Sequence, residues 1–250
     1  MYTMQRSFKV GVALAAFATA MFSTSVMASE LPAYKDLGNL ENGKKIFTDG
    51  KGDVPACTSC HGPDGLGEDS MGTPRLAGQG FSFLVKQLED FATDKRMDTT
   101  MYIMNNNAKG LSEQDRRDVA AYVASIDKPV GGSDMKAVKE LGSTPVGVRY
   151  IGKGLAQYGA PERGIPACHS CHGYNGRGAF PIYPRIGGQK YVYLVGQLKK
   201  WRDGSRANDP MSQMQIVAKK MSDEDIYNVS TFLTSAPQTT IGNARVPEQR

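Results

Sequence analysis

Two short stretches of this 250-residue chain hold all four of its cysteines. They read Cys57-Thr-Ser-Cys60-His61 and Cys168-His-Ser-Cys171-His172. A Cys-x-x-Cys-His run is the attachment pattern of a c-type haem. Two thiols three positions apart on one turn reach the two vinyl groups of one haem, and the His that follows faces the iron. The sequence therefore predicts two covalently bound haem c groups, with His61 and His172 as iron ligands.

Two other chemistries use paired cysteines. A redox-active disulfide belongs in a thioredoxin-like βαβ setting, which the helical pattern of this chain lacks. Structural zinc sites usually draw on cysteine pairs that lie closer together than the 111 positions found here. Neither alternative explains why a His follows both pairs, so covalent haem is favoured.

The second axial ligand of each iron can be narrowed by elimination. The chain has three His, and the third, His169, lies inside the second attachment turn, away from either distal face. Bis-His ligation of both haems within one chain is therefore excluded, and no Cys is left over. Methionine remains, and its soft thioether favours ferrous iron.

The motifs belong to a longer repeat. Pro74-Arg75-Leu-Ala-Gly-Gln79 recurs 110 positions later as Pro184-Arg185-Ile-Gly-Gly-Gln189. A constant offset over many positions indicates a tandem duplication, and each copy is long enough for a small domain. At this offset only Met101/Met211 and Met104/Met214 pair Met with Met. Both pairs are expected in a loop, and spacing alone leaves the choice between them open.

Each copy is expected to fold as helices. Apolar residues share one helical face in both copies: Leu84, Leu88 and Phe91, then Leu194, Leu198 and Trp201. Ser112 with Asp115, and Ser222 with Asp225, form capping-box starts of a further helix. Shorter helices are expected around 40–47 and 150–158, and no alternating strand pattern appears. The predicted fold class is all-α, with two tandem haem domains.

The first 28 residues resemble an export signal. Arg6 and Lys9 precede the apolar run Val10–Phe22, and Val26-Met27-Ala28 is a small-residue cleavage pattern. We expect cleavage after Ala28 and a periplasmic mature protein. An uncleaved membrane anchor is the alternative, and peripheral membrane association is compatible with either.

The remaining organisation follows from the repeat and from breaker residues. The predicted parts are a signal peptide over 1–28, a first domain over 29–127, a linker over 128–146, a second domain over 147–236 and a flexible tail over 237–250. The formal charge of +5 includes two basic residues of the leader, which leaves +3 for the mature chain. This weak charge, without a basic run, excludes a nucleic-acid binder.

The combined motifs resemble the dihaem cytochrome c4 family. The shared features are the tandem Cys-x-x-Cys-His-Gly units, the Pro-Arg-[Leu/Ile]-x-Gly-Gln segments, the following aromatic-x-x-Leu-x-x-Gln-Leu helices and Arg202-x-x-x-Arg206-Ala-Asn-Asp-Pro-Met211. The resemblance implies two class I cytochrome c folds with His/Met ligation. In that family the ligand Met lies eight residues before the Ser that opens the last helix, which implies Met104 and Met214. The polar stretch Asn105–Asn107 beside Met104 is unusual there.

The resemblance also implies supporting roles. Pro74 and Pro184 would offer their carbonyls to the ring N–H of the haem-ligating His, although each could be a simple turn proline. Arg75 and Arg185 would pair with haem propionates, with a solvated Arg as the alternative.

The function that follows is electron transfer without catalysis. The resemblance implies a periplasmic dihaem cytochrome between redox partners such as a quinol–cytochrome c reductase and a terminal haem–copper oxidase. An alternative is an electron-accepting subunit of a periplasmic dehydrogenase that acts on a sulfur compound or carries a flavin. A dihaem enzyme such as a peroxidase would need an open iron, and two good Met candidates argue against it.

Overall fold

The computed structural model describes residues 37–129, 131–179 and 181–237. The predicted signal peptide over 1–28 and the tail beyond Pro237 lie outside these residues. Within them regular structure is helical, and β-pairing is limited to isolated bridges such as Lys51 with Val54. The predicted all-α fold class is confirmed. None of the described helices has the length and hydrophobicity that crossing a bilayer requires.

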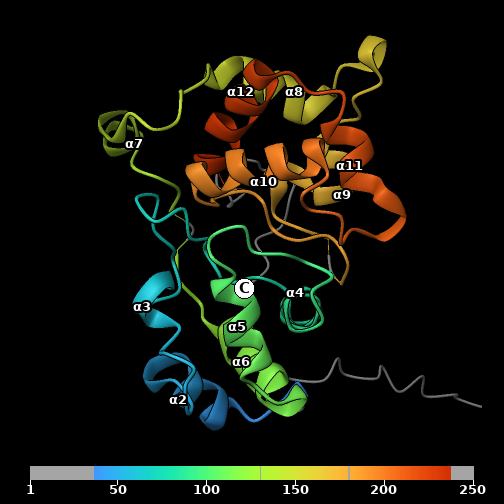
Figure 1. Ribbon diagram of the computed structural model, residues 1–250. Coiled ribbons are helices and arrows are strands. Elements are labelled where there is room, and N and C mark those ends of the chain that lie inside the picture. Colours follow the sequence, from blue (N-terminus) through green and yellow to red (C-terminus); the bar gives the residue numbers. More distant parts are fainter. Residues whose placement is uncertain (1–36, 130, 180, 238–250) are drawn as a thin grey trace, which may run out of the picture. The chain divides into compact units, whose positions relative to one another are not determined.

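The helices follow the repeat (Figure 1). The first copy contains α2 (Leu40–Asp49), α3 (Thr58–His61), α4 (Phe81–Ala92), α5 (Ile103–Lys109) and α6 (Glu113–Ser125). The second contains α8 (Arg149–Tyr158), α9 (Cys168–His172), α10 (Tyr191–Asp203), α11 (Gln213–Ala218) and α12 (Asp223–Thr234), and α7 (Met135–Leu141) lies between the copies. The helices expected from periodicity are present. Where a loop was expected around the paired Met residues, the short helices α5 and α11 are found instead.

The last helix of each copy begins as the capping pattern predicts. The amide of Asp115 donates to the hydroxyl of Ser112 at 3.1 Å, and the carboxylate of Asp115 accepts from the Ser112 amide. The pair Ser222 and Asp225 repeats both bonds at the start of α12. Each box pairs backbone N–H groups that a helix leaves without internal partners.

Two separate hydrophobic cores form, one in each copy. Phe47 and Val119 are buried in the first core, and Leu155 and Phe232 are buried in the second. In each, the first helix crosses the last at a glycine. A Cβ atom built on Gly43 would lie 2.1 Å from the carbonyl oxygen of Asp118, and one on Gly152 would lie 1.8 Å from that of Asn228. Only glycine permits this approach of two backbones.

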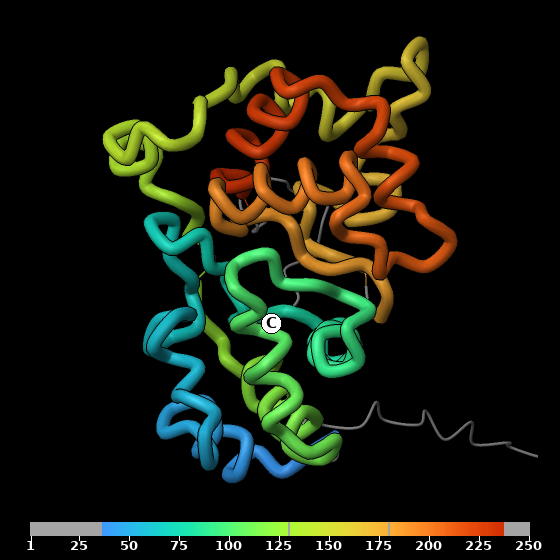
Figure 2. The backbone as a smooth tube through the Cα atoms, in the orientation of Figure 1, coloured from blue at the N-terminus to red at the C-terminus, as the bar shows by residue number. Residues whose placement is uncertain are grey.

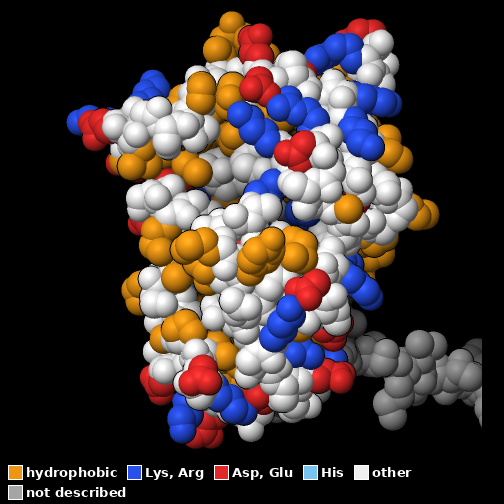
Figure 3. All heavy atoms as spheres, in the orientation of Figure 1, with side chains coloured by type: hydrophobic (Ala, Val, Ile, Leu, Met, Phe, Trp, Pro, Cys, Tyr) orange, Lys and Arg blue, Asp and Glu red, His pale blue; other side chains and the backbone are white. Residues whose placement is uncertain are grey.

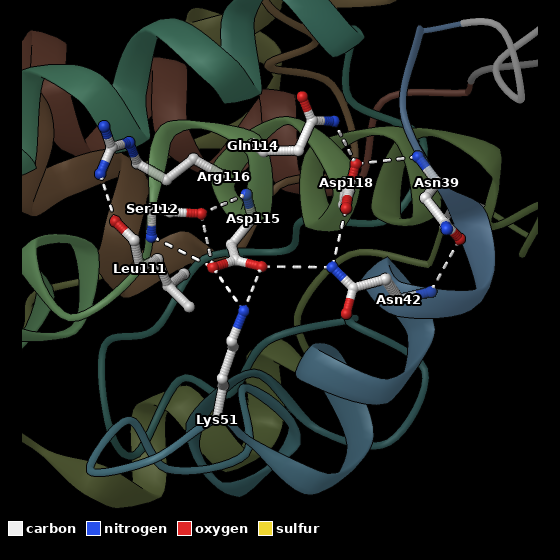
Figure 4. Close-up of polar contacts among 9 residues, drawn as sticks. All are labelled: Asn39, Asn42, Lys51, Leu111, Ser112, Gln114, Asp115, Arg116 and Asp118. Atoms are coloured by element: carbon white, nitrogen blue, oxygen red, sulfur yellow. Dashed lines mark hydrogen bonds and ion pairs between the residues drawn. The ribbon is translucent and has the colours of Figure 1, made fainter.

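Polar side chains of α6 fix the start of α2 (Figure 4). Asp118 accepts hydrogen bonds from the Asn39 amide at 2.8 Å and from the Asn42 side chain at 2.7 Å. Burial alone would raise the pKa of the neighbouring Asp115. Hydrogen bonds from Lys51, Ser112 and Asn42 outweigh that effect and lower the pKa to about 2.

The stretch expected as a linker contributes a helix to the second copy. Val138 on α7 is 1% exposed and belongs to the core of that copy. The amide of Ser133 donates to the Thr234 hydroxyl at 2.8 Å, and the Ser133 hydroxyl accepts from the Tyr191 amide at 2.8 Å. In Figure 2 this segment is the yellow-green part of the tube.

Candidate haem sites

Each pair of cysteines lies on a single short helical turn. In α3 the His61 amide donates to the Cys57 carbonyl at 3.0 Å, so both thiols and the imidazole extend from one turn. The hydroxyls of Ser59 and Ser170 each donate to a carbonyl three residues earlier at 2.6 Å. The two attachment turns therefore share one local design.

The thiols do not have the lowered pKa of a redox-active cysteine pair. The four cysteines form no disulfide with one another, and burial raises the pKa of the Cys57 and Cys168 thiols to about 11. Redox-active Cys-x-x-Cys pairs have a lowered thiol pKa, since the thiolate is the attacking species. Among the described residues no group of three or more His, Cys, Asp or Glu is arranged to hold a metal ion.

The two imidazoles are held in the form that ligates iron. His61 Nδ1 lies 3.0 Å from the Pro74 carbonyl oxygen, and His172 Nδ1 lies 2.9 Å from that of Pro184. Because a carbonyl can only accept, Nδ1 carries the proton and Nε2 carries the lone pair. Burial lowers the pKa of both His residues, against the opposing effect of the carbonyl bond. Burial therefore favours the neutral form of both rings.

The third imidazole contacts residues that directly follow its own turn. His169 Nε2 accepts a hydrogen bond from the Asn175 amide at 3.1 Å, and its ring packs near Tyr174 with 5.6 Å between centroids. His169 is therefore engaged on the side of the second attachment turn.

Exposure separates the two methionine pairs. Met101 and Met211 are each 80% exposed, whereas Met104 and Met214 are half-buried in the first turn of α5 and of α11. A side chain that reaches an iron inside the fold must be shielded from solvent. The difference in exposure therefore favours Met104 and Met214, which we call the inner methionines.

Each inner methionine is held by an aspartate that the sequence interpretation missed. The Met104 amide donates to Asp98 at 3.1 Å, and the Met214 amide donates to Asp209 at 2.7 Å. The preceding residue pairs, Met101–Tyr102 and Met211–Ser212, all have positive φ. Such backbone is costly for residues other than glycine and is found at functional sites. The aspartates were missed because their positions differ by one residue between the copies.

The structure gives a reason for Asn105, the first residue of the polar stretch beside Met104. Its side-chain amide donates to the carbonyls of Phe91 and Arg96, at 3.0 Å and 2.9 Å, and its oxygen accepts from the Asp98 amide at 2.7 Å. Only 1% of this residue is exposed. Asn105 thus ties the end of α4 to the helix that carries Met104.

Arg75 and Arg185 lie close together, each directly after the proline whose carbonyl contacts a His ring. The Arg75 guanidinium donates to the carbonyls of Ala77, Pro129 and Lys128 and is 2% exposed. Burial, and then the positive charge of Arg185, lower the pKa of Arg75. Two neighbouring guanidinium groups, one buried on Arg75 and one partly exposed on Arg185, favour anionic carboxylates nearby.

A second pair of buried arginines joins the copies. Arg96 and Arg206 are each 7% exposed, and both donate to the side-chain oxygen of Gln87, at 2.7 Å and 3.0 Å. Burial, and then the charge of Arg96, lower the pKa of Arg206 to about 9. Sequence analysis assigned no role to Arg96, although its partner at the 110-residue offset is Arg206.

The residues present fit a covalent haem in each copy. Paired thiols, a neutral imidazole with Nδ1 engaged and a half-buried thioether supply the attachment and ligand chemistry.

Comparison with known proteins agrees with two covalent haem sites in this chain. The family model for cytochrome c matches residues 40–127 and 163–237. The thiosulfate dehydrogenase electron acceptor of Stutzerimonas stutzeri (strain A1501) is 36% identical over 80% of this chain and 89% of its own length. Cytochrome c4 of Pseudomonas aeruginosa is 36% identical over 74% of this chain and 85% of its own.

Solved structures agree in fold. The crystal structure of reduced recombinant cytochrome c4 from Pseudomonas stutzeri superposes with a TM-score of 0.64 at 32% identity, covering 80% of this chain and all of that one. The thiosulfate dehydrogenase TsdBA from Marichromatium purpuratum gives a TM-score of 0.70 at 31% identity. That match covers 79% of this chain and 40% of the longer one.

Proposed function

Since the chain belongs to the dihaem cytochrome c4 family and is an electron-transfer protein with two covalent haem c groups, we propose that it works in the periplasm as a carrier between other redox proteins rather than as an enzyme. Each bound haem supplies one reversible ferric–ferrous step. The protein's own residues hold, orient and shield the iron.

In this proposal the two copies use equivalent ligand sets. Cys57 and Cys60 attach the first haem, and His61 and Met104 ligate its iron. Cys168, Cys171, His172 and Met214 do the same in the second copy. Support comes from the neutral, carbonyl-bound imidazoles and from the half-buried position of the inner methionines. Arg75 and Arg185 would offset propionate charge at the boundary between the copies.

The observation that carries the carrier function is the surface beside each inner methionine. Met101, Tyr102 and Ile103 are 80%, 53% and 39% exposed, and Met211 and Ile216 are 80% and 54% exposed. Figure 3 shows hydrophobic side chains gathered across the middle of the face drawn. Exposed apolar residues beside a redox centre suit brief docking of a partner, since they release water without requiring one fixed set of ion pairs.

The experiment begins with the purified mature holoprotein. Denaturation and acid–acetone extraction should leave both haems on the chain, and Cys168→Ala should retain the first haem. Stopped-flow mixing should then show reduction by a quinol–cytochrome c reductase and oxidation by a terminal haem–copper oxidase. Failure to exchange electrons with either protein would contradict a respiratory carrier.

A second candidate role is specific acceptance of electrons from a sulfur-compound dehydrogenase. It is favoured by the similarity to a thiosulfate dehydrogenase electron acceptor and to part of a thiosulfate dehydrogenase chain. Rapid reduction of the holoprotein by such an enzyme and thiosulfate, together with slow reduction by the quinol–cytochrome c reductase, would establish this role instead.

The proposed periplasmic localisation can be tested separately from electron transfer. The proposed signal peptide ends at Ala28, so the mature chain should begin at Ser29. N-terminal sequencing of protein from the periplasmic fraction should return Ser29, and an intact Met1 in the membrane fraction would instead indicate an uncleaved anchor.

A further inference from the structure

Two glutamine side chains, Gln79 and Gln189, each bind the backbone of the opposite copy, and we call them the glutamine clamps. Gln79 donates from Nε2 to the Arg185 carbonyl oxygen at 2.6 Å and accepts at Oε1 from the Arg185 amide at 3.0 Å. Gln189 donates to the Arg75 carbonyl oxygen at 2.9 Å and accepts from the Arg75 amide at 2.6 Å. Each clamp thus binds both backbone groups of one residue in the opposite copy.

Both clamps are buried. Gln79 is 6% exposed and Gln189 is 5% exposed. Hydrogen bonds shielded from water are stronger electrostatically, and a buried partner left unpaired is costly. The clamps therefore fix the backbone they hold.

The clamped backbone is the one that holds the haem-ligating imidazole. Arg185 directly follows Pro184, so the Pro184 carbonyl and the Arg185 N–H belong to one planar amide. That carbonyl oxygen lies 2.9 Å from His172 Nδ1, and that N–H donates to Gln79. The result is a continuous chain of hydrogen bonds from His172 through one peptide group to a side chain of the other copy.

The first copy repeats this chain in the opposite direction. His61 Nδ1 lies 3.0 Å from the Pro74 carbonyl oxygen, and the N–H of the same peptide group, on Arg75, donates to Gln189. The arrangement is reciprocal, since each copy supplies the clamp for the other.

We propose that Gln79 and Gln189 are positioning residues and that each tunes the reduction potential of the haem in the opposite copy. This inference rests on the proposed ligation of iron by His61 and His172. An amide whose N–H is bound by an acceptor is more polarised, so its carbonyl accepts more strongly from the imidazole. A stronger bond at Nδ1 makes the imidazole a more basic ligand, which favours ferric iron.

The direction of the effect follows. Without Gln79, the Pro184–Arg185 amide loses its acceptor and its fixed orientation, and His172 becomes a weaker donor to iron. The potential of the second haem should rise while that of the first stays near its original value. Without Gln189, the first haem should change and the second should not. A clamp that merely joined the copies would give no such crossed pattern.

The test uses Gln79→Leu and Gln189→Leu in the mature holoprotein, because leucine keeps most of the volume and removes the amide. An NMR-monitored redox titration follows the resolved haem signals of each copy separately. We expect each variant to shift the electron-exchange equilibrium between the haems by about threefold toward the haem opposite the substitution. Lys86→Met is the matched control: it removes another bond between the copies, from Lys86 Nζ to the Asn208 carbonyl at 2.8 Å, and leaves both clamped amides intact.

Equal shifts at both haems, a shift only in the substituted copy, or no shift would each overturn the proposal. Hydrogen exchange in the unsubstituted reduced protein gives a second measurement if a variant does not fold. The Arg75 and Arg185 amides should be strongly protected, and rapid exchange at either would overturn it. The ligation itself is checked first: if the unsubstituted protein lacks low-spin His-ligated spectra, the ligand assignment fails, whereas intact spectra with uncrossed potentials reject the clamps alone.

Discussion

The two copies differ little where the cysteines lie and much where the methionines lie. His61 and His172 contact their proline carbonyls at 3.0 Å and 2.9 Å. Around Met104, by contrast, the Asn105 side chain donates to the carbonyls of Phe91 and Arg96, whereas around Met214 the side chain of the equivalent Gln215 donates to Asp209. Duplication has kept the attachment side and allowed the methionine side to diverge. The irons should therefore differ through their distal surroundings.

The largest effect expected is at the inner methionines. Met104→Ala and Met214→Ala should each open one iron, halve the Met–ferric charge-transfer band and allow carbon monoxide to bind the reduced haem. The potential of the opened haem should fall, because ferrous iron loses its soft ligand. Absorption spectra and carbon monoxide titration measure these changes.

Matched controls are available one helical turn earlier. Met101→Ala and Met211→Ala remove side chains that are 80% exposed, so stability should change by less than about 0.5 kcal/mol and the band should persist. Loss of the band in these variants, with the inner variants unaffected, would move the assignment to Met101 and Met211.

Replacing the glycine at the helix crossing should lower the free energy of unfolding by a similar amount in both copies. Gly43→Ala and Gly152→Ala place a Cβ about 2 Å from a backbone oxygen, so each should lower the free energy of unfolding by about 1–3 kcal/mol. Gly154→Ala is the control on α8, since a Cβ there meets nothing within 4 Å and should stabilise the helix by up to about 1 kcal/mol. Thermal unfolding followed at the haem absorbance compares the three, and a neutral Gly152→Ala would contradict the close crossing.

Because the surroundings of the two inner methionines differ, equivalent substitutions beside them should cost unequal amounts of unfolding free energy. Asn105→Ala leaves buried carbonyls unpaired and should cost about 1–3 kcal/mol, whereas Gln215→Ala should cost less than about 1 kcal/mol. Denaturant unfolding of both variants provides the comparison. Equal costs would show that the two loops are more alike than their hydrogen bonds indicate.

The smallest effect expected is on the pH dependence of the unfolding free energy. The pKa of Asp115 is lowered to about 2 from an unfolded value near 3.9, so the folded state binds its proton less readily. Its stabilisation is present above pH of about 4 and is lost as pH falls toward 2. In Asp115→Asn, the unfolding free energy should therefore fall less steeply across this range. An unchanged slope would mean that Asp115 is not the group responsible.

Sequence reasoning predicted the elements that periodicity and capping specify locally. Leu84, Leu88 and Phe91 identified α4, and the pair Ser112 and Asp115 marked the start of α6. The short α7 was interpreted as linker because glycines flank it and seven residues give little periodicity. Helices α5 and α11 were expected as loops because they too are short and show little periodicity.

The site was predictable where chemistry depends on spacing along the chain. The Cys-x-x-Cys-His motifs needed no tertiary information, whereas the role of the prolines came from the family resemblance, and their carbonyls do contact the His rings. The contact of Gln79 with Arg185 was not predictable, although the repeat included Gln79, because the two residues are 106 positions apart. An internal repeat identifies equivalent residues and says nothing about which copy each one contacts.

The burial of Val138 sets where this molecule can be divided. A second half that starts at residue 147 would lack α7 and leave a hole in its own core, whereas one that starts near residue 132 would keep α7 and the Ser133 bonds to Thr234 and Tyr191. Any recombination, natural or engineered, that exchanges one haem module for another must therefore transfer α7 with the C-terminal module. The peptide between α6 and α7 is itself held on the side of the first copy, because the carbonyls of Lys128 and Pro129 accept hydrogen bonds from Arg75.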